Sequence, residues 1–279
     1  MAGTVPTALD VPADDVDGGR VIAFQHALAR LSLTALLSSI AIALIAGLGT
    51  RFGIWNYDVG LSGIFPVAIY SGLAAFAFGL LWMLTALFAG GGPGALSAII
   101  GFVGAIAILW VPLDDLYRAR IEQVLPPIHD ISTDTEHAPE FIAPGRPGDA
   151  IPPAYDGQLR VRYDGKVSTA ETLQKLAYGE IRPVAKLGTT PEKMFHRALT
   201  AARNMGWTIV ATAPDSRGGF IQATDTTLLF GLTDDIVLRV RPAGLGARLD
   251  IRSRSRFGES DFGRNAARIH AYMKEFGAT

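Results

Sequence analysis

Hydrophobic and polar positions divide the chain into an apolar N-terminal part and a more polar C-terminal part. The longest apolar stretch runs from Val59 to Leu113 and contains no Asp, Glu, Lys, Arg or His. A membrane span needs about 20 mostly apolar residues, so this stretch is long enough for two spans. The turn at residues 90–94, Gly-Gly-Gly-Pro-Gly, separates the two.

A third apolar segment precedes this stretch, between Arg30 and Arg51. We therefore expect three transmembrane helices, at residues 31–49, 62–89 and 95–111. Residues 1–20 are acidic and contain Pro and Gly, which is typical of a mobile tail and not of the basic start of a signal peptide. The predicted organisation is a disordered tail at 1–20, a three-helix transmembrane domain at 21–116, a proline-rich connector at 117–187 and an α+β domain at 188–279.

The pattern changes in the last ninety residues. An apolar stripe with helical spacing follows Thr190 and Pro191, a second one follows Asp261, and alternating segments typical of strands lie between them. Short loops join the alternating segments, so we expect an antiparallel sheet with two helices on one face and a polar opposite face. Trp207 should anchor the core between the first helix and the sheet.

Composition excludes several classes of protein. The 279 residues include no cysteine, so disulfides and thiolate chemistry are absent. From Thr190 onward, 13 Lys and Arg face 9 Asp and Glu, and this excess is too small to indicate nucleic-acid binding. No ionisable group lies within the two later spans, which argues against ion-coupled transport. We find no phosphate-binding, dinucleotide or hydrolase motif and expect no cofactor.

Two segments carry a family resemblance: Ile128–Asp134 (IHDISTD) and Val237–Ile269, the latter especially in its parts Asp250–Gly258 (DIRSRSRFG) and Asp261–Ile269 (DFGRNAARI). From Leu125 onward the chain resembles the bacterial membrane-anchored branch of domain of unknown function family 1499. Soluble members of that family often have a cysteine-containing segment where this chain has His129 and Asp130. The resemblance implies a domain identity and an envelope location, and it implies no reaction.

A row of arginines is the first candidate binding site. Period-two alternation in two neighbouring strands should place these side chains on the open face of the sheet: Arg239, Arg241, Arg248, Arg252 and Arg254. Arginine suits phosphate and carboxylate groups, so an anionic lipid or another envelope component is a possible partner. The alternative is a solvated sheet face with cross-strand ion pairs.

A second set of polar residues gathers around turns and the start of the last helix. A pocket is one interpretation of this set: Asp234, Asp235, Ser253, Ser255, Arg256, Asp261, Asn265 and Arg268. A structural role is the other interpretation, in which Asp261 caps the helix and Arg268 ties it to Asp234 or Asp235.

The third set follows the last span and comprises His129, Asp130, Asp134, Glu136 and His137. Imidazole and carboxylate groups bind metals, but the spacing matches no known metal motif, so we predict no metal site. A membrane-tethered enzyme or metal-binding protein would use His129, Asp130 and Asp134, or else Arg252, Asp261 and Asn265. That hypothesis gains support only if both groups line one pocket.

The preferred hypothesis is a protein without defined catalysis that is embedded in the lipid bilayer and presents its α+β domain as a binding or scaffolding module. The expected location is the bacterial inner membrane. Three spans place the C-terminal domain on the same side as the loop at residues 51–60. The arginine count around the spans slightly favours a cytoplasmic domain, but the resemblance favours the periplasmic side, and we expect the latter.

Overall fold

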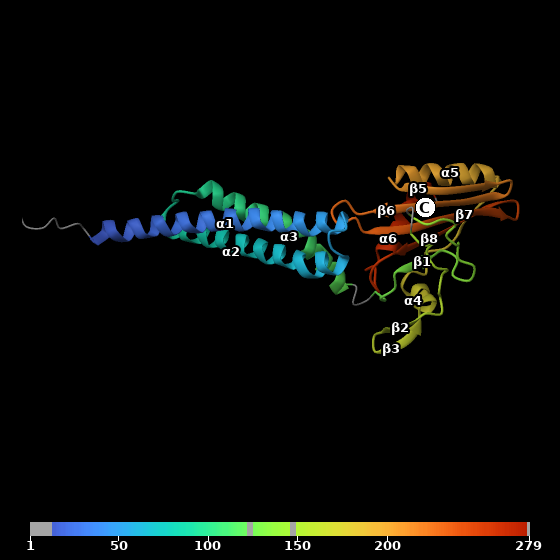
Figure 1. The fold of residues 1–279 in the computed structure, drawn as a ribbon, viewed down its shortest axis with the longest axis horizontal. Helices are drawn as coiled ribbons and strands as arrows, with labels where there is room; N and C mark the ends of the chain where they lie inside the picture. Colours follow the sequence, from blue (N-terminus) through green and yellow to red (C-terminus); the bar gives the residue numbers. More distant parts are fainter. Residues whose placement is uncertain (1–12, 122–124, 146–148, 278–279) are drawn as a thin grey trace, which may run out of the picture. The chain divides into compact units, whose positions relative to one another are not determined.

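The computed structural model describes residues 13–121, 125–145 and 149–277. The chain divides into two compact units, Met1–Leu116 and Tyr117–Thr279. Figure 1 labels their helices and strands along the chain.

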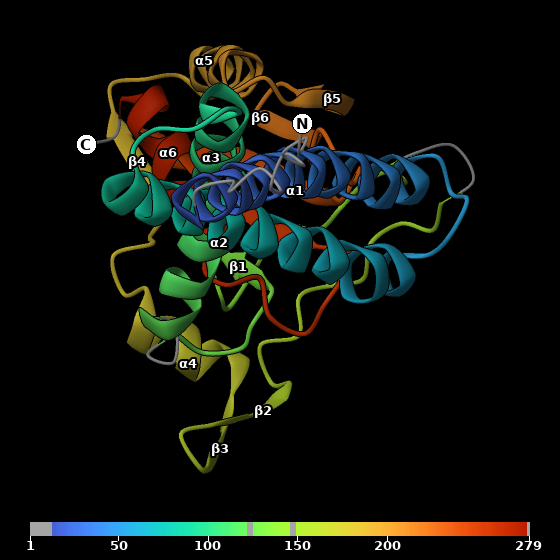
Figure 2. The same cartoon turned by 90° about the vertical axis from the view of Figure 1, so that its left-hand side faces the viewer.

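The first unit contains helices α1 (Ala13–Arg51), α2 (Phe65–Ala89) and α3 (Ala95–Ile121), which lie alongside one another (Figure 2). A π-helical turn, η1 (Asp58–Ile64), leads directly into α2. Pro66 follows this turn, and because proline has no N–H the regular helical bonding is interrupted there.

Small side chains allow these helices to approach closely. The Ser32 hydroxyl donates to the Ala75 carbonyl at 2.8 Å, and the Ser39 hydroxyl donates to the Ala68 carbonyl at 2.7 Å. At Gly79 a Cβ atom would lie 2.8 Å from the Cβ of Phe102, so no side chain fits there. Such contacts are typical of helix pairs in membranes, where packing replaces the hydrophobic drive.

Two of the expected spans meet the requirements of length and composition. Gly18–Arg51 and Asp58–Ala89 are long and apolar enough to cross a membrane, whereas the apolar part of α3, Ala95–Trp110, is shorter. The third span therefore stays a prediction. Helix α1 begins well before the expected start of the first span, so residues 13–20 are helical and not part of a tail. Residues 1–12 lie outside the described part of the chain.

The second unit is built on a six-stranded sheet, and the antiparallel sheet expected from the sequence is confirmed. The path of neighbouring strands is β1-β8-β7-β6-β5, and β4 also pairs with β8. The strand bounds are β1 (Asp130–Ser132), β4 (Val184–Leu187), β5 (Thr208–Asp215), β6 (Gly218–Thr226), β7 (Thr233–Ala243) and β8 (Gly246–Ser255). A separate hairpin comprises β2 (Arg160–Tyr163) and β3 (Lys166–Thr169).

Helices α5 (Pro191–Asn204) and α6 (Arg264–Phe276) pack on the apolar face of this sheet. Thr190 caps α5 by accepting from the backbone N–H of Lys193 at 3.2 Å, with Pro191 in the first turn. Trp207 is buried between the helices and the sheet, as predicted, and its ring stacks on Tyr272 at 5.1 Å.

The segment expected as a connector belongs to this unit instead. Residues Asp130–Ser132 form β1, and helix α4 (Ala170–Ala177) contributes Leu173 to the core. The prolines prevent long regular elements, but they do not prevent an irregular segment from packing. Parts of the segment predicted as a connector therefore lie in the core of the second unit.

Candidate functional site

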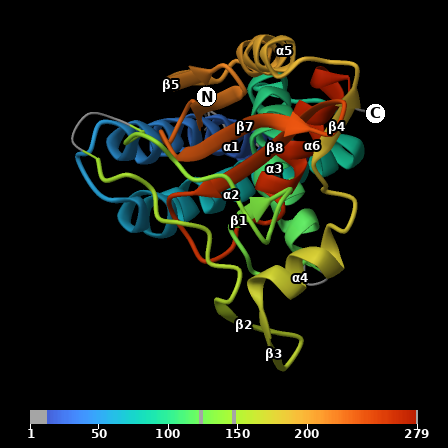
Figure 3. The same ribbon diagram turned by 90° about the vertical axis from the view of Figure 1, so that its right-hand side faces the viewer.

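The arginine row lies on one face of the sheet, opposite the helices. In the β7–β8 pairing Arg241 faces Arg248, and Arg239 faces Asp250. This face is covered and not open, which corrects the expectation from the sequence. The cover is an irregular segment that we call the strap, residues 133–158, of which 133–145 and 149–158 are described; Figure 3 shows it crossing β7 and β8.

Two aspartates form ion pairs with three arginines of the row. Asp134 of the strap accepts from Arg239, Arg241 and Arg248 at 3.3, 2.9 and 2.7 Å through one carboxylate oxygen. Buried Asp250 binds the same three guanidinium groups from below, at 2.6–3.1 Å. Burial raises the pKa of Asp134, but the N–H of His137 and the three arginine charges outweigh it, so the pKa lies below its ordinary value.

Arg252 is the most deeply held member of the row, with no exposed surface. Its guanidinium group binds both carboxylate oxygens of Asp130, at 2.8 and 2.7 Å. It also donates to the carbonyls of Pro139 and Pro153 in the strap, at 3.2 and 2.9 Å. The rings of Phe141 and Tyr155 lie 4.8 and 5.7 Å from its central carbon. Arg252 therefore connects β1, β8 and the strap and cannot reach a membrane surface.

The strap is fixed at two further points. The side chain of Gln222 accepts from the backbone N–H groups of Ile142 and Ala143 and donates to the carbonyl of Ala143. Arg256 binds Asp235 at 2.8 Å and Asp149 at 2.6 Å. The strap passes so close to Arg256 at Gly145 that a Cβ atom there would displace the guanidinium group.

The second predicted set divides between the two faces. Ser253, Ser255, Asn265 and Arg268 form one hydrogen-bonded cluster under α6, at 2.6–3.1 Å. Asp235 and Arg256 lie on the strap side instead. The proposed group of Arg252, Asp261 and Asn265 is therefore split by the sheet and does not form one pocket.

Residues of the α6 cluster have clear structural roles. Arg268 binds Asp234 at 2.5 Å and also Asp225, which the sequence analysis did not select. The carboxylate of Asp261 accepts from the backbone N–H groups of Gly263 and Asn265, at 2.8 and 2.9 Å. Burial raises the pKa of Asp261, and the bonds to Asn265 and Gly263 oppose that effect. Asp261 thus caps the first turn of α6, although the helix itself begins at Arg264.

The third predicted set does not converge either. The carboxylates of Asp130 and Asp134 bind arginines, while the imidazole of His129 lies 3.2 Å from the carbonyl of Glu259. Within the described ranges, no three His, Asp or Glu side chains form a group that could hold a metal ion.

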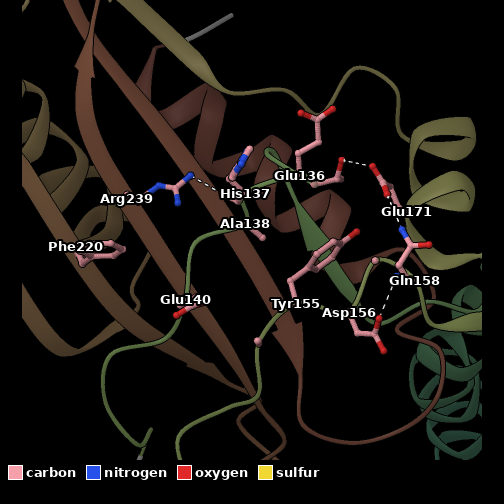
Figure 4. Close-up of a pocket in the computed structure, with 13 residues that line it drawn as sticks. Glu136, His137, Ala138, Glu140, Tyr155, Asp156, Gln158, Glu171, Phe220 and Arg239 are labelled. Carbon is pink, nitrogen blue, oxygen red and sulfur yellow. Dashed lines mark hydrogen bonds between the residues drawn. The ribbon is translucent and has the colours of Figure 1, made fainter.

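A cleft of about 780 Å³ opens between the strap, α4 and β7. Figure 4 shows Tyr155 centrally among the lining side chains, with His137 and Glu136 on one side and Asp156 on the other. The complete lining is Thr135, Glu136, His137, Ala138, Glu140, Ala154, Tyr155, Asp156, Gly157, Gln158, Glu171, Phe220 and Arg239. The volume lies within the range of small-molecule sites.

Acidic side chains outnumber basic ones in the lining, with Glu136, Glu140, Asp156 and Glu171 against Arg239. Glu171 accepts from Lys175, Thr135 and Gln158 at 2.6, 3.0 and 3.3 Å, and the bond from Lys175 lowers its pKa most. Glu136, Glu140 and Asp156 are exposed at the cleft. A smaller cavity of about 450 Å³ adjoins it and has a lining of mixed charge, with Asp134 and Glu136 beside Lys175, Arg241 and Arg248. Of the two, only the larger cleft has an excess of charge of one sign, and it suits a cationic group.

Sequence analysis missed most of this lining, including Glu140, Tyr155, Asp156, Gln158, Glu171 and Phe220. These residues come from the strap, α4 and β6, and no periodicity connects them. Three lining residues did stand out in the sequence: Arg239, as a member of the arginine row, and Glu136 and His137, in the set for which we predicted no metal site.

The geometry defines an α+β domain whose charged sheet face is closed by its own N-terminal segment, in a chain that also carries apolar helices. Residues 158–276 match the model of the family described as Protein of unknown function (DUF1499), so this part of the chain belongs to that family. The match begins after β1 and the strap, so the segment Ile128–Asp134 lies outside it. No curated protein and no solved structure matches the chain.

Proposed function

We propose that this chain is an integral membrane protein that presents its C-terminal domain as a binding module without catalysis. The packing of the first unit supports this proposal. Large apolar side chains such as Leu37, Leu87 and Phe88 point outward, whereas Ala29, Ala75 and Gly79 are buried. In water the hydrophobic effect would favour the reverse arrangement. Lipid is the solvent in which this arrangement is stable.

All three helices cross the membrane in this proposal, and the C-terminal domain lies on the periplasmic side of a bacterial inner membrane. The absence of charge from Val59 to Leu113 supports a third span in α3. Close contact between Gly101 of α3 and Ser32 of α1 supports a common bundle. The family resemblance supports the periplasmic side.

Single cysteines test the topology directly, because the chain contains none of its own. Phe52→Cys and Gly91→Cys place the label in the two loops between helices, and Ser216→Cys places it in a turn of the C-terminal domain. A membrane-impermeant maleimide applied to spheroplasts should label positions 52 and 216. It should label position 91 only after permeabilisation.

Each alternative gives a different pattern. Labelling of 91 and 216 together, on the side opposite to 52, would leave only two spans. Labelling of 91 alone before permeabilisation would place the C-terminal domain in the cytoplasm. Release of the protein by alkaline carbonate would contradict membrane integration itself.

The acidic cleft is the proposed binding site of the module, and its ligand carries positive charge. The observation behind this is the exposure of Glu136 and Glu140 in one cavity with Tyr155 as a central aromatic wall. The enzyme hypothesis is less well supported, because Asp130 and Asp134 already compensate arginine charges.

Spermidine is a suitable cationic probe for the full chain in detergent. Glu136→Gln with Glu140→Gln should weaken its binding about tenfold, which corresponds to about 1.4 kcal/mol. The control pair Glu180→Gln with Glu192→Gln removes the same charge from exposed positions that do not line the cleft. Titration calorimetry distinguishes them. Equal losses in both pairs would indicate a general charge effect and contradict a site in the cleft.

A further inference from the structure

At one end of the six-stranded sheet, the loops that join its strands carry large apolar side chains exposed to solvent. Two loops form this end of the sheet, the β6–β7 loop (residues 227–232) and the β8–α6 loop (residues 256–263). We call these two loops the apolar edge. Leu228 is 87% exposed, Phe262 59% and Phe257 50%. Pairing of Asp234 with Ser255 places both loops at the same end of the sheet, as Figure 1 shows. Exposed apolar groups of this kind mark interaction surfaces.

The chain enters the domain at the same edge. The carbonyl of His129 accepts from the N–H of Ser255 at 2.9 Å, and the carbonyl of Ile128 accepts from the N–H of Asp261 at 3.2 Å. Helix α3 ends at Ile121, seven residues before Ile128 in the chain. The covalent tether to the apolar helices therefore reaches the domain at its apolar edge.

The opposite end of the sheet lies far from the point where the tether enters the domain. Strand β7 has 11 residues and extends about 36 Å from the apolar edge to the β7–β8 turn. Leu245 in that turn is 89% exposed. Leu245 thus matches Leu228 in residue type and exposure but lies far from the point where the chain enters.

The backbone fixes Phe262 in its exposed position. Its φ angle is 53°, in the left-handed region that bulky residues rarely adopt. The capping bonds of Asp261 to Gly263 and Asn265 hold the residues around it. Unusual backbone of this kind persists only where neighbours enforce it, and it concentrates at functional positions.

Two arginines at this edge are compensated by aspartates, while Glu259 of the β8–α6 loop is exposed. Arg268 binds Asp225 and Asp234, and Arg256 binds Asp149 and Asp235. Exposed Arg264 follows Phe262 by two residues. Aromatic side chains with an adjacent cation are suited to the headgroup region of a bilayer.

We propose that the apolar edge inserts Leu228, Phe257 and Phe262 into the surface of the bilayer that holds the apolar helices. The domain then has a second, non-covalent membrane contact in addition to its tether, and this contact sets its orientation. The inference rests on the proposed membrane integration of the first unit.

Site-specific labels in the cysteine-free full chain test this contact. Leu228→Cys, Phe262→Cys and the matched control Leu245→Cys are each labelled with the polarity-sensitive fluorophore NBD and reconstituted in phosphatidylcholine–phosphatidylglycerol vesicles. Labels at 228 and 262 should emit at shorter wavelength and lose intensity when brominated lipids are present. The label at 245 should show aqueous emission that brominated lipids leave unchanged.

The outcomes separate this inference from the anchoring proposal. A chain that incorporates into vesicles but has aqueous labels at 228 and 262 would overturn the inference alone. A chain that does not incorporate would overturn both. Short-wavelength emission at 228 without quenching by brominated lipids would show that protein, such as a second copy, covers this edge, and that result also contradicts lipid insertion.

Discussion

Replacing Arg252 with alanine should lower the free energy of unfolding of the C-terminal domain by about 3–5 kcal/mol. The guanidinium group has no exposed surface and makes both bonds to Asp130. Its removal leaves the Asp130 carboxylate with only the longer ion pair to Arg254, at 3.6 Å, and two strap carbonyls, of Pro139 and Pro153, without this donor. The loss should appear in pulse proteolysis of the full chain in urea, as a lower midpoint.

The neighbouring arginine provides a matched control. Arg254 lies on the same strand and face, but its side chain is 20% exposed and its ion pair with Asp130 is long at 3.6 Å. Arg254→Ala should therefore cost about 1 kcal/mol or less. Hydrogen exchange should increase throughout the strap in Arg252→Ala and change little in Arg254→Ala. Equal effects of the two changes would contradict the special role assigned to Arg252.

The burial of Arg252 also limits what charge reversal can reveal. Arg252→Glu places two carboxylates together in a closed space, where like charges destabilise each other. A loss of ligand or lipid binding in that variant would report unfolding of the strap and not the removal of a binding group. Partly exposed Arg241 and Arg248 are the members of the row where substitution can test binding.

Local patterns predicted the regular part of the domain. Alternation identified the strands that contain Leu238 and Ile251, because one face of the sheet is apolar and side chains alternate strictly. The Thr190-Pro191 signal located the start of α5, because capping depends on neighbouring residues only. These features need no knowledge of distant contacts.

The cover of the arginine face could not be predicted in this way. Asp134 lies more than one hundred residues before Arg239 in sequence, and its segment has no periodicity. The residue types were suggestive, since three arginines alternating with apolar residues require counter-charges if they are buried. Cross-strand ion pairs follow from the alternation of the strands, but no local pattern places Asp134 on the sheet.

In the helical part, too, some features were predicted from the sequence and others were missed. The lack of charge identified the apolar segments, since composition alone distinguishes them. The start of α1 at Ala13 was missed, because its first turns contain Asp14, Asp15 and Asp17, which read as a polar tail. Acidic residues are in fact favourable in the first turns of a helix, where they complement its dipole.

Trp207→Ala should destabilise the C-terminal domain by about 3–5 kcal/mol, the second large effect that the structure predicts. The indole is 5% exposed and stacks on Tyr272 at 5.1 Å, and Tyr272 in turn stacks on Phe276 at 6.2 Å. Truncation opens a cavity between α5, α6 and the sheet that the stacked rings cannot fill. The urea midpoint in pulse proteolysis of the full chain measures the loss.

Two further variants make this result specific. Trp207→Phe keeps an aromatic ring in the stack, so it should lose less stability than the alanine variant. Leu245→Ala removes an exposed apolar side chain from a turn, and surface changes of this kind fall within about 0.5 kcal/mol. An unchanged midpoint for Trp207→Ala would contradict the packing of α6 against the indole, because the substitution removes the ring on which Tyr272 stacks.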